Sequence, residues 1–340
     1  MRVAPFAGTP TDWDAFAGAH PGWTPCHRFG WKRVIEDVFG HETRFLAAHD
    51  DAGALRGILP LVRVRSLVFG HFLVSMPFLN DGGPLGSDAA VAALAEHAAA
   101  LADRTGVGLL ELRSRRPLPV PLPVSHRKVT VLLDLAGGDP EALWARLPSK
   151  LRSQVRRPMK DGITVRFGAD ELEPFYAVFA HHMRDLGTPA LPRRFFEALR
   201  SAFGDDVWFG CAYAGDRAVA AGCALAIPDE VEMTWASALR RFKATSANML
   251  LYWAFIDRAA RSGHARFNFG RCTPGSGTHR FKLQWSADER PLWWYQHARR
   301  GRHATPAPTD PAFAWGPRLW RRLPLPLATV LGPRIVRSIP

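Results

Sequence analysis

The sequence predicts an α/β protein made of two similar lobes, each a mixed β-sheet with helices packed on it. The chain has 340 residues, 47% of them hydrophobic and 22% charged, which is enough for two folded domains of ordinary size. A β-β-β-α-β order occurs twice, and a proline-rich segment separates the two copies. We therefore expect a ligand cleft between the lobes or beside their strand ends.

The first copy consists of a hairpin, a further strand-like or irregular run, a helix and a closing strand. Strand-like residues on either side of the turn at 50–53 predict the hairpin. Ser87 or Asp88 can cap the helix, and Gly106 can close it. The expected elements are the strands 45–49 and 57–64, the helix 88–105 and the strand 108–113.

The second copy repeats this plan. Its hairpin turns at 214–217, and its helix begins near Ser246 or Asn248 and is closed by Gly263. The expected elements are the strands 208–213 and 219–227, the helix 248–262 and the strand 266–269.

Prolines at 117, 119, 121 and 123 alternate with other residues, which favours an extended strap without backbone donors. We place the domain boundary in this strap. The predicted parts are an N-terminal lobe at 1–116, a linker at 117–125, a C-terminal lobe at 126–300 and a basic tail rich in Pro and Trp at 301–340.

A helical region precedes the second hairpin. From 140 to 157 the pattern is helical, and Arg152, Arg156 and Lys160 recur at intervals of four, which gives one basic face. Pro158 must bend or end this helix. The basic face is either solvated or binds phosphate. A later helix ends at Gly187 and contains adjacent histidines at 181 and 182, which point to different faces and so do not suit a metal pair.

A glycine-rich loop follows the strand at 266–269. Gly270, Gly275 and Gly277 allow close backbone approach to a ligand, and three cations follow them. Lysine is rare in this chain, with six residues at 32, 128, 150, 160, 243 and 282. The loop therefore predicts an anion site, with a solvated surface loop as the alternative. The cations of the loop are Arg271, Arg280 and Lys282.

The net charge of +13 favours polyanionic partners such as RNA, anionic lipid headgroups or a phosphate-bearing substrate. The four cysteines form no Cys-x-x-Cys pair and have no histidine at metal spacing, so neither a metal site nor a disulfide framework is expected. The most apolar region, 55–79, is interrupted by Arg56, Arg63, Arg65 and His71. We therefore expect a cytoplasmic protein without a membrane span.

Short motifs spread over nearly the whole chain carry a family resemblance. They lie at 40–41, 59–61, 74–78, 81–83, 149–158, 183–189, 235–237, 248–253, 268–271, 277–285, 320–327 and 331–333. Together they resemble the FemAB-like family, specifically the branch associated with the exosortase/PEP-CTERM system. More distantly they resemble the GNAT acyltransferases, whose fold the FemAB proteins duplicate. The resemblance thus implies two tandem GNAT-like lobes.

The resemblance implies amide formation, in which an activated acyl or aminoacyl group passes to an amine. FemAB relatives transfer it from aminoacyl-tRNA to peptidoglycan precursors, and the lysine that matches Lys282 helps to stabilise the tetrahedral charge. The chain departs from the family at His279, where tyrosine is more usual, and at Asn268, where aspartate is. It also lacks the long helical arm of the peptidoglycan-bridge enzymes. An amine-bearing envelope or exopolysaccharide precursor is the implied acceptor, and tRNA a possible partner.

The residues themselves agree with this chemistry. Attack of an amine on an ester or thioester creates an oxyanion that Lys282 and backbone N–H groups can stabilise. His279, Asp185 and Glu232 are the candidates for removing the amine proton, and a substrate phosphate is the alternative. We expect no tightly bound cofactor.

The donor is either aminoacyl-tRNA or acyl-CoA. The spaced glycines with which a GNAT enzyme holds the pyrophosphate of CoA are missing from 240–248, although arginines there could hold phosphates. The residues predicted to bind substrates are Lys150, Arg152, Arg156, Arg184, Trp235, Ser237, Asn248, Tyr252, Arg271, Gly275, Gly277, Thr278 and Arg280.

Two other classes of function stay open. The first is a non-catalytic binding or assembly module at the inner membrane face, held there by Trp315, Trp320, Arg321, Arg322 and the apolar run 323–331. The same tail could instead pack across the lobes as a strap. The second is nucleic-acid binding, which only the net charge favours.

Overall fold

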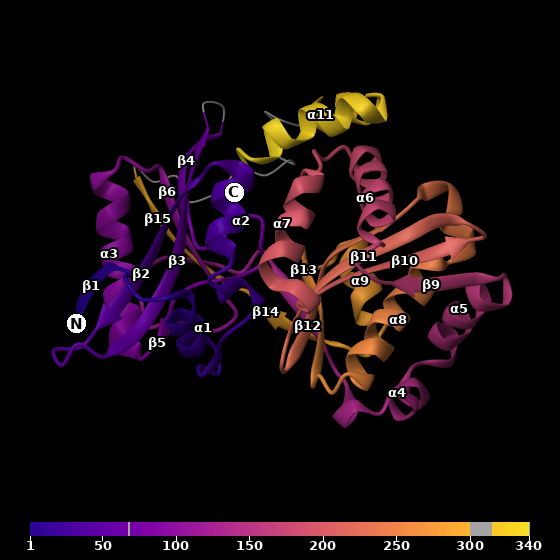
Figure 1. Ribbon diagram of the computed structural model, residues 1–340, viewed down its shortest axis with the longest axis horizontal. Helices are drawn as coiled ribbons and strands as arrows, with labels where there is room; N and C mark the ends of the chain where they lie inside the picture. The colour runs from indigo at the N-terminus through magenta and orange to yellow at the C-terminus, as the bar shows by residue number, and fades with distance from the viewer. Residues whose placement is uncertain (67–68, 300–314, 340) are drawn as a thin grey trace. The chain divides into compact units, whose positions relative to one another are not determined.

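The computed structural model describes residues 1–66, 69–299 and 315–339 (Figure 1). These residues form two compact units. Unit 1 contains Met1–Lys128 together with 291–299 and 337–339, and unit 2 contains Val129–Arg290 together with 315–336. Residues 291–299, which the sequence pattern assigns to the second lobe, thus return to unit 1. Of the predicted tail, 301–314 lies outside the described residues.

The sheet of unit 1 has the strand order β1-β2-β3-β4-β6-β15-β7, and β5 pairs with β3. Neighbouring strands are antiparallel except β4 and β6, which run parallel from Phe72↔Leu109 to Val74↔Glu111. The strands are β1 Arg2–Pro5, β2 Glu42–His49, β3 Leu55–Ser66, β4 Gly70–Val74, β5 Leu85–Gly86, β6 Leu109–Ser114, β7 Val124–Ser125 and β15 Trp293–Ala298.

The helices of unit 1 are α1 Pro10–Gly18, α2 Trp31–Phe39, α3 Asp88–Arg104 and the 3₁₀ turn η1 Pro25–His27. Ser87 caps α3 by accepting a hydrogen bond from the N–H of Ala90, as its position in the sequence predicts. A Cβ atom on Gly57 would lie 2.8 Å from the Cβ of Ala90, so this glycine lets the alanine-rich helix pack closely on β3. Leu94 and Ala98 of α3 join the core of the unit.

The sheet of unit 2 has the order β14-β8-β13-β12-β11-β10-β9. It is mixed, because β12 and β13 run parallel while the other pairs given by the register are antiparallel. The strands are β8 Val129–Asp134, β9 Ile163–Phe167, β10 Val207–Ala214, β11 Arg217–Ile227, β12 Glu230–Ala238, β13 Arg266–Cys272 and β14 Asp288–Pro291.

Helices cover both faces of this sheet (Figure 1). On one face, Phe255 of α8 packs 4.8 Å from Phe167, measured between ring centroids. On the other, Phe175 of α6 packs 5.4 Å from Phe209. The helices are α4 Pro140–Arg146, α5 Ser149–Lys160, α6 Leu172–Leu186, α7 Arg193–Phe203, α8 Ala247–Arg261, α9 Gly277–Leu283, α10 Trp315–Trp320 and α11 Leu325–Val336, with 3₁₀ turns η2 Ala136–Gly138, η3 Gly204–Asp206 and η4 Arg240–Thr245.

Two local expectations are corrected. The single helix expected at 140–157 is two helices, α4 and α5, because Pro148 follows Leu147 and breaks the pattern. Pro158 does not end α5, which continues to Lys160. It lies in the last turn, where its missing N–H affects one backbone hydrogen bond and its buried ring contributes packing.

The repeated order is confirmed: β2-β3-β4-α3-β6 in unit 1 matches β10-β11-β12-α8-β13 in unit 2. In each copy the third strand runs parallel to the strand that follows the helix. The predicted fold class, two mixed sheets flanked by helices, is therefore confirmed. No helix in the described part of the chain has the length and apolar character needed to cross a bilayer.

Candidate functional site

The sheet of unit 2 opens between its two parallel strands. β12 and β13 pair only from Glu230↔Arg266 to Glu232↔Asn268. Beyond that point β12 continues along β11, and β13 continues along β8. The split therefore begins at Glu232 and Asn268. Separated strand ends leave unpaired backbone groups and side chains that a ligand can reach.

A β-bulge lies on each side of this split. Between the pairs Cys223↔Trp235 and Leu225↔Glu232, one residue of β11 lies opposite two of β12. On the other side, between Asn268↔Leu132 and Arg271↔Thr130, two residues of β13 lie opposite one of β8. Gly270 lies in the second bulge with φ +72°, a conformation that favours glycine. Bulges redirect side chains and are frequent beside active sites.

Asn268 is the centre of a buried hydrogen-bond network at the split. Its Nδ2 donates to Glu230 Oε1 at 3.0 Å and to Glu232 Oε2 at 3.2 Å. Its Oδ1 accepts from Thr130 Oγ1 at 2.7 Å and from the N–H of Gly270 at 2.8 Å. An amide can donate to two carboxylates and accept at the same time, which an aspartate cannot. The two glutamates thus account for an asparagine at this position.

Lys282 reaches the same bulge from α9. Its Nζ donates to the carbonyl of Gly270 at 2.7 Å and to that of Arg271 at 2.9 Å, and only 3% of the residue is exposed. Burial lowers the pKa of Lys282 to about 8, against the opposing influence of Cys272 and Glu232. The ammonium group thus holds the bulge and keeps one N–H without a protein acceptor among the described residues.

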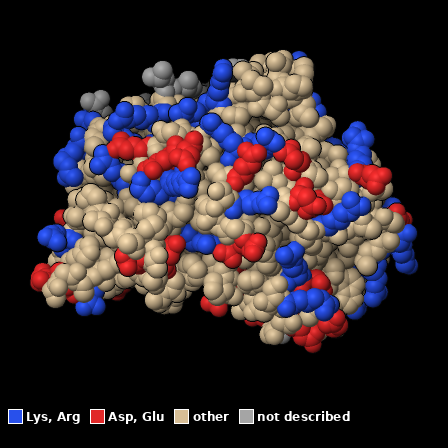
Figure 2. Space-filling view, in the orientation of Figure 1, with Lys and Arg blue, Asp and Glu red and all other residues tan. Residues whose placement is uncertain are grey.

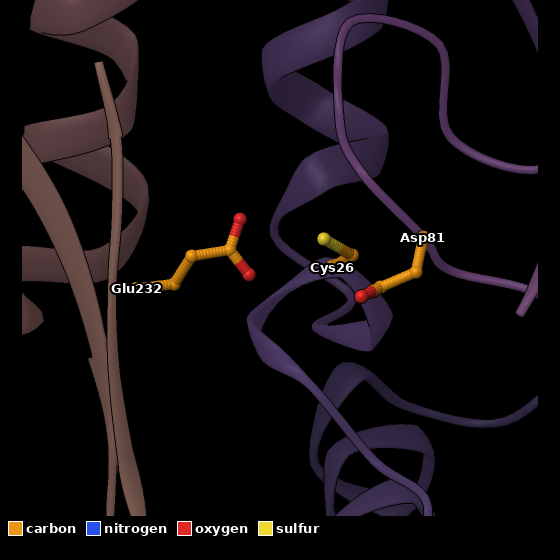
Figure 3. A group of neighbouring side chains, drawn as sticks. All are labelled: Cys26, Asp81 and Glu232. Atoms are coloured by element: carbon orange, nitrogen blue, oxygen red, sulfur yellow. The ribbon is translucent and has the colours of Figure 1, made fainter. Parts of the chain in front are cut away.

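Glu232 is a carboxylate whose charge raises the pKa of Lys282, in opposition to burial. It extends from β12, as Figure 3 shows, and is 1% exposed. Thr234 Oγ1 donates to its Oε1 at 3.0 Å, and Asn268 holds the other oxygen. The bulge, Glu232 and Lys282 therefore form one electrostatic group, which the sequence alone separated by fifty positions.

His279 lies in the loop beside Lys282 but has both ring nitrogens engaged. Its Nδ1 accepts from the N–H of Gly275 at 3.1 Å, so the ring proton resides on Nε2, which contacts Glu289. The ring is 9% exposed. Both ring nitrogens of this predicted base are thus bonded within the protein.

The glycine loop makes much of its structure from its own groups. Gly275 has φ +74°, and its carbonyl accepts from Arg280 Nη1 at 2.6 Å. The N–H groups of Gly270 and Gly275 are both bonded to side chains of the loop region. Gly277 and Thr278 are exposed at the start of α9, where Ser276 caps the N–H of His279. Of the residues predicted for the anion site, Gly270 and Gly275 thus have N–H groups bonded within the protein, while Gly277 and Thr278 are exposed.

A second group of polar residues surrounds the beginning of α8. A pocket of about 190 Å³ lies there between the end of β12 and the helix. Ser246, just before the helix, has φ +57°, which is unusual for a residue other than glycine. Burial lowers the pKa of His182, and Arg240 lowers it further while Asp185 opposes the change. The lining residues are His182, Val219, Ala238, Leu239, Arg240, Phe242, Lys243, Ala247 and Asn248.

Asp185 belongs to the end of α6. Its Oδ1 accepts from Arg184 Nε at 2.7 Å, and its Oδ2 lies 3.3 Å from His181 Nδ1. Arg184 also donates to the carbonyl of Leu323 at 3.2 Å. Asp185 thus acts on His182 of the second group, and Arg184 is bonded to Asp185.

The predicted basic face of α5 borders a groove of about 450 Å³. Arg156 lies over the ring of Trp144, 5.3 Å from its centroid. Lys150 is exposed at the first turn and Arg152 is half-buried. The residues along the groove are Ser149, Arg152, Ser153, Arg156, Arg157, Lys160 and Asp161.

The remaining predicted residues are mostly buried. Trp235 packs on Phe195 and Phe196, and Ser237 follows it along β12. Tyr252 stacks on Phe269 in the core, and burial raises its pKa. Sequence reasoning did not select Glu230, Thr130 or His182. The alternation Glu230-Val231-Glu232 is the signal that could have indicated two acids on one face of a strand.

The corresponding place in unit 1 is filled by its own chain. After β4 ends at Val74, the N–H of Ser75 donates to the carbonyl of Glu111 at 2.9 Å. Ser75 Oγ accepts from the N–H of Arg113 at 2.7 Å, and Arg113 Nη1 donates to the carbonyl of Leu79 at 3.0 Å. The segment 75–83 is buried apart from Phe78, which is half-buried. Within the described residues, the segment 75–83 of unit 1 thus bonds to β6 where the corresponding strands of unit 2 part.

This buried segment ends in an ionic network. Cys26 and Asp81 of unit 1 are drawn in Figure 3. Thr24 Oγ1 donates to Asp81 Oδ1 at 2.5 Å, and Arg115 contacts the other oxygen. Burial raises the pKa of Asp81, but the charge of Arg115 and the hydrogen bond from Thr24 lower it, and the net shift of its pKa is downward. Burial lowers the pKa of His27 to about 4, so its ring is neutral at pH 7.

Comparison with known families adds a match over the site. Residues 148–283 match the model described as an acetyltransferase (GNAT) domain. The matched segment runs from α5 to the end of α9 and contains the split, both bulges and Lys282. No curated protein matches the chain in sequence.

Solved structures share the fold over most of the chain. A crystal structure of FemX has a TM-score of 0.67 at 13% identity, covering 87% of this chain and 97% of its own. L-PGS from Bacillus licheniformis gives 0.56 at 11% identity, with 97% of both chains covered. A DUF2156 domain from Agrobacterium fabrum, assigned to a lysylphosphatidylglycerol synthetase, gives 0.57 at 11%, covering 84% of this chain and 89% of its own. At these identities the similarity concerns the fold.

Proposed function

We propose that unit 2 is a FemAB-like acyltransferase that forms an amide on an amine of a cell-envelope or exopolysaccharide precursor, within the exosortase-associated branch. The observation that carries this proposal is the buried group of Glu232, Asn268 and Lys282 at the strand split, inside the segment that matches a GNAT domain. FemX and a lysylphosphatidylglycerol synthetase among the structural neighbours agree with aminoacyl transfer to an envelope component.

In the proposed reaction the acceptor nitrogen attacks the acyl carbonyl carbon, and the bond from that carbon to the oxygen or sulfur of the carrier breaks. The negative charge that develops on the carbonyl oxygen is stabilised by the third N–H of Lys282. Glu232 accepts the proton that the amine loses. Among the three predicted bases, Glu232 is favoured because its charge acts on Lys282, whereas His279 is held by Glu289 and Asp185 by Arg184.

The donor would place its phosphates at the pocket beside α8. Arg240 and Lys243 are exposed there, and the positive end of a fifteen-residue helix points to the same place. Acyl-CoA and aminoacyl-tRNA both present phosphates, so both fit this chemistry. The glycine-free segment 240–248 makes arginine and lysine, rather than backbone N–H groups alone, the expected phosphate ligands.

Paired substitutions test the catalytic group. Full-length protein is incubated with labelled acetyl-CoA or labelled aminoacyl-tRNA and a panel of amines. Lys282→Ala and Glu232→Gln should each lower transfer by about 100-fold or more. Glu230→Gln is the matched control, because Glu230 bonds the same Asn268 amide but does not act on Lys282. Equal losses in the two glutamate variants would contradict the role of Glu232.

The pH profile tests the charge of Lys282. In the proposed reaction the protonated side chain of Lys282 stabilises the oxyanion. The value of kcat/KM should therefore decline as pH rises through about 8, the pKa to which burial lowers Lys282. A plateau that extends to pH 10 would contradict this role, since a lysine that stays charged to its ordinary pKa would not produce the decline.

If the acceptor is linked to the membrane, the enzyme works at the inner membrane face. We therefore propose that the protein associates peripherally with that membrane. The C-terminal helices carry the surface suited to that contact.

A further inference from the structure

The helices α10 and α11 present large apolar side chains that are exposed in the part of the chain that the structure describes. Leu319, Leu327, Val330 and Leu331 are 56%, 51%, 61% and 39% exposed. We call these four residues the tail face. Large exposed apolar residues grouped in this way mark an interaction site.

The tail face has a regular helical arrangement. Leu327, Val330 and Leu331 follow the i, i+3, i+4 spacing of one α11 face, and exposed Arg334 continues it at i+7. The opposite face, with Ala328 and Gly332, is buried. A Cβ on Gly332 would lie 3.1 Å from the backbone nitrogen of Ala190. This side of α11 therefore packs closely on the segment between α6 and α7.

The orientation of these helices is fixed by polar contacts to α6. Arg321 Nη2 donates to the carbonyl of Leu186 at 3.2 Å, and Arg184 donates to that of Leu323. Leu186 is itself 42% exposed and extends the apolar surface. The tail face is thus held outward by contacts within unit 2.

The charged residues of the segment 315–339 have one sign. Residues 315–339 contain arginines at 318, 321, 322, 334 and 337 and no aspartate or glutamate. Figure 2 shows the surface over α11 as a tan area with blue atoms at its edge. Apolar residues bordered by cations complement a membrane surface that carries anionic lipids. A symmetric contact between two copies would instead bring arginines together.

We propose that the tail face docks on anionic phospholipid. The four apolar side chains enter the interface between headgroups and acyl chains, while Arg318, Arg322 and Arg334 contact lipid phosphates. This contact extends the proposed function by bringing the enzyme to its acceptor, but it does not require transfer activity. Its test is therefore a binding measurement that is independent of catalysis.

The experiment is co-sedimentation of the full-length protein with vesicles of phosphatidylcholine, with and without phosphatidylglycerol. Binding is expected only when phosphatidylglycerol is present. Val330→Asp/Leu331→Asp should reduce the partition coefficient by more than about tenfold, since two apolar side chains leave the interface. Arg318→Gln/Arg322→Gln should reduce it by about fivefold per arginine.

Met159→Asp is the matched control. Met159 is 56% exposed on α5, close to the 61% of Val330, and this variant should pellet like the unaltered protein. Failure to bind phosphatidylglycerol vesicles would overturn the proposal, as would equal binding to phosphatidylcholine alone. Conversion of a dimer to a monomer by Val330→Asp/Leu331→Asp, without vesicle binding, would show instead that copies of this chain pair through the tail face.

Discussion

The amide of Asn268 lets two glutamates coexist at the strand split. Both Glu230 and Glu232 are buried and accept from its Nδ2. Like charges in one buried site repel, and each buried carboxylate needs donors. Asn268 thus supplies a donor to each of the two buried carboxyl groups.

Asn268→Asp should destabilise the protein by about 2 kcal/mol near neutral pH, because two donors are lost and a third carboxyl is added. The neighbouring acids raise the pKa of the new carboxyl in the folded state. The loss of stability should therefore grow as pH rises from about 4 toward 7. Denaturant unfolding at several pH values measures it.

The double variant Glu230→Gln/Asn268→Asp provides the control. The new amide can donate to the introduced carboxylate, so most of the lost stability should return. A double variant as unstable as the single one would show that the network does not account for the effect.

At the scale of elements, the regular periods of the chain predict most of the fold. The hairpins, α3, α8 and the parallel strand after each helix follow from alternating or helical apolar patterns and from caps such as Ser87. The two bulges do not, because an extra residue in a strand is fixed by its partner's register rather than by its own pattern. Lys282 was predicted as a loop cation, but its contact with the carbonyls of the second bulge required the fold.

The return of β15 to unit 1 was also hidden from the sequence. Trp293–Ala298 pairs with β6, nearly 180 positions earlier, and a strand pattern does not specify so distant a partner. The segment 291–299 reads like a continuation of the second lobe because it follows β14 directly.

The packing of α10 on α6 depends on the glycine that ends α6. Gly187 has φ +81°, and a Cβ there would lie 2.5 Å from the carbonyl oxygen of Pro317. Gly187→Ala should therefore cost about 1 kcal/mol for the left-handed backbone and, in addition, displace α10. It should also weaken vesicle binding, because the tail face loses its support.

Gly263→Ala is the control for backbone strain alone. Gly263 has φ +82° at the end of α8, with no atom within 4 Å of its added Cβ. Thermal unfolding measures the loss of stability in each variant. The difference between the two losses gives the contribution of the contact with Pro317. Equal destabilisation, with unchanged vesicle binding, would mean that α10 adapts without cost.

At the scale of the molecule, the two units share an order of elements. They differ at the place where the third strand of each copy parts from the strand that follows the helix. In unit 2 the strands part at Glu232 and Asn268, while in unit 1 the chain after Val74 fills the same place. The strained residues Met76, with φ +57°, and Phe78, with φ +70°, belong to that filling segment. Surrounding contacts such as those of Arg113 hold them in this conformation. The two copies of the fold thus place different residues where these strands part: carboxylates and an amide in unit 2, and the chain segment 75–83 in unit 1.

One donor molecule should therefore bind per chain, although the chain contains two lobes of the same plan. Calorimetric titration of the full-length protein with CoA, acetyl-CoA and aminoacyl-tRNA measures the stoichiometry. For the donor that binds, we expect one site, weakened by Arg240→Ala/Lys243→Ala because both cations line the pocket at α8. Two sites of similar affinity would mean that the segment 75–83 leaves unit 1, which its buried hydrogen bonds oppose. A single site whose affinity is unchanged in Arg240→Ala/Lys243→Ala would contradict phosphate binding at α8. The exposed start of α9, at Gly277 and Thr278, would then be the next place to test.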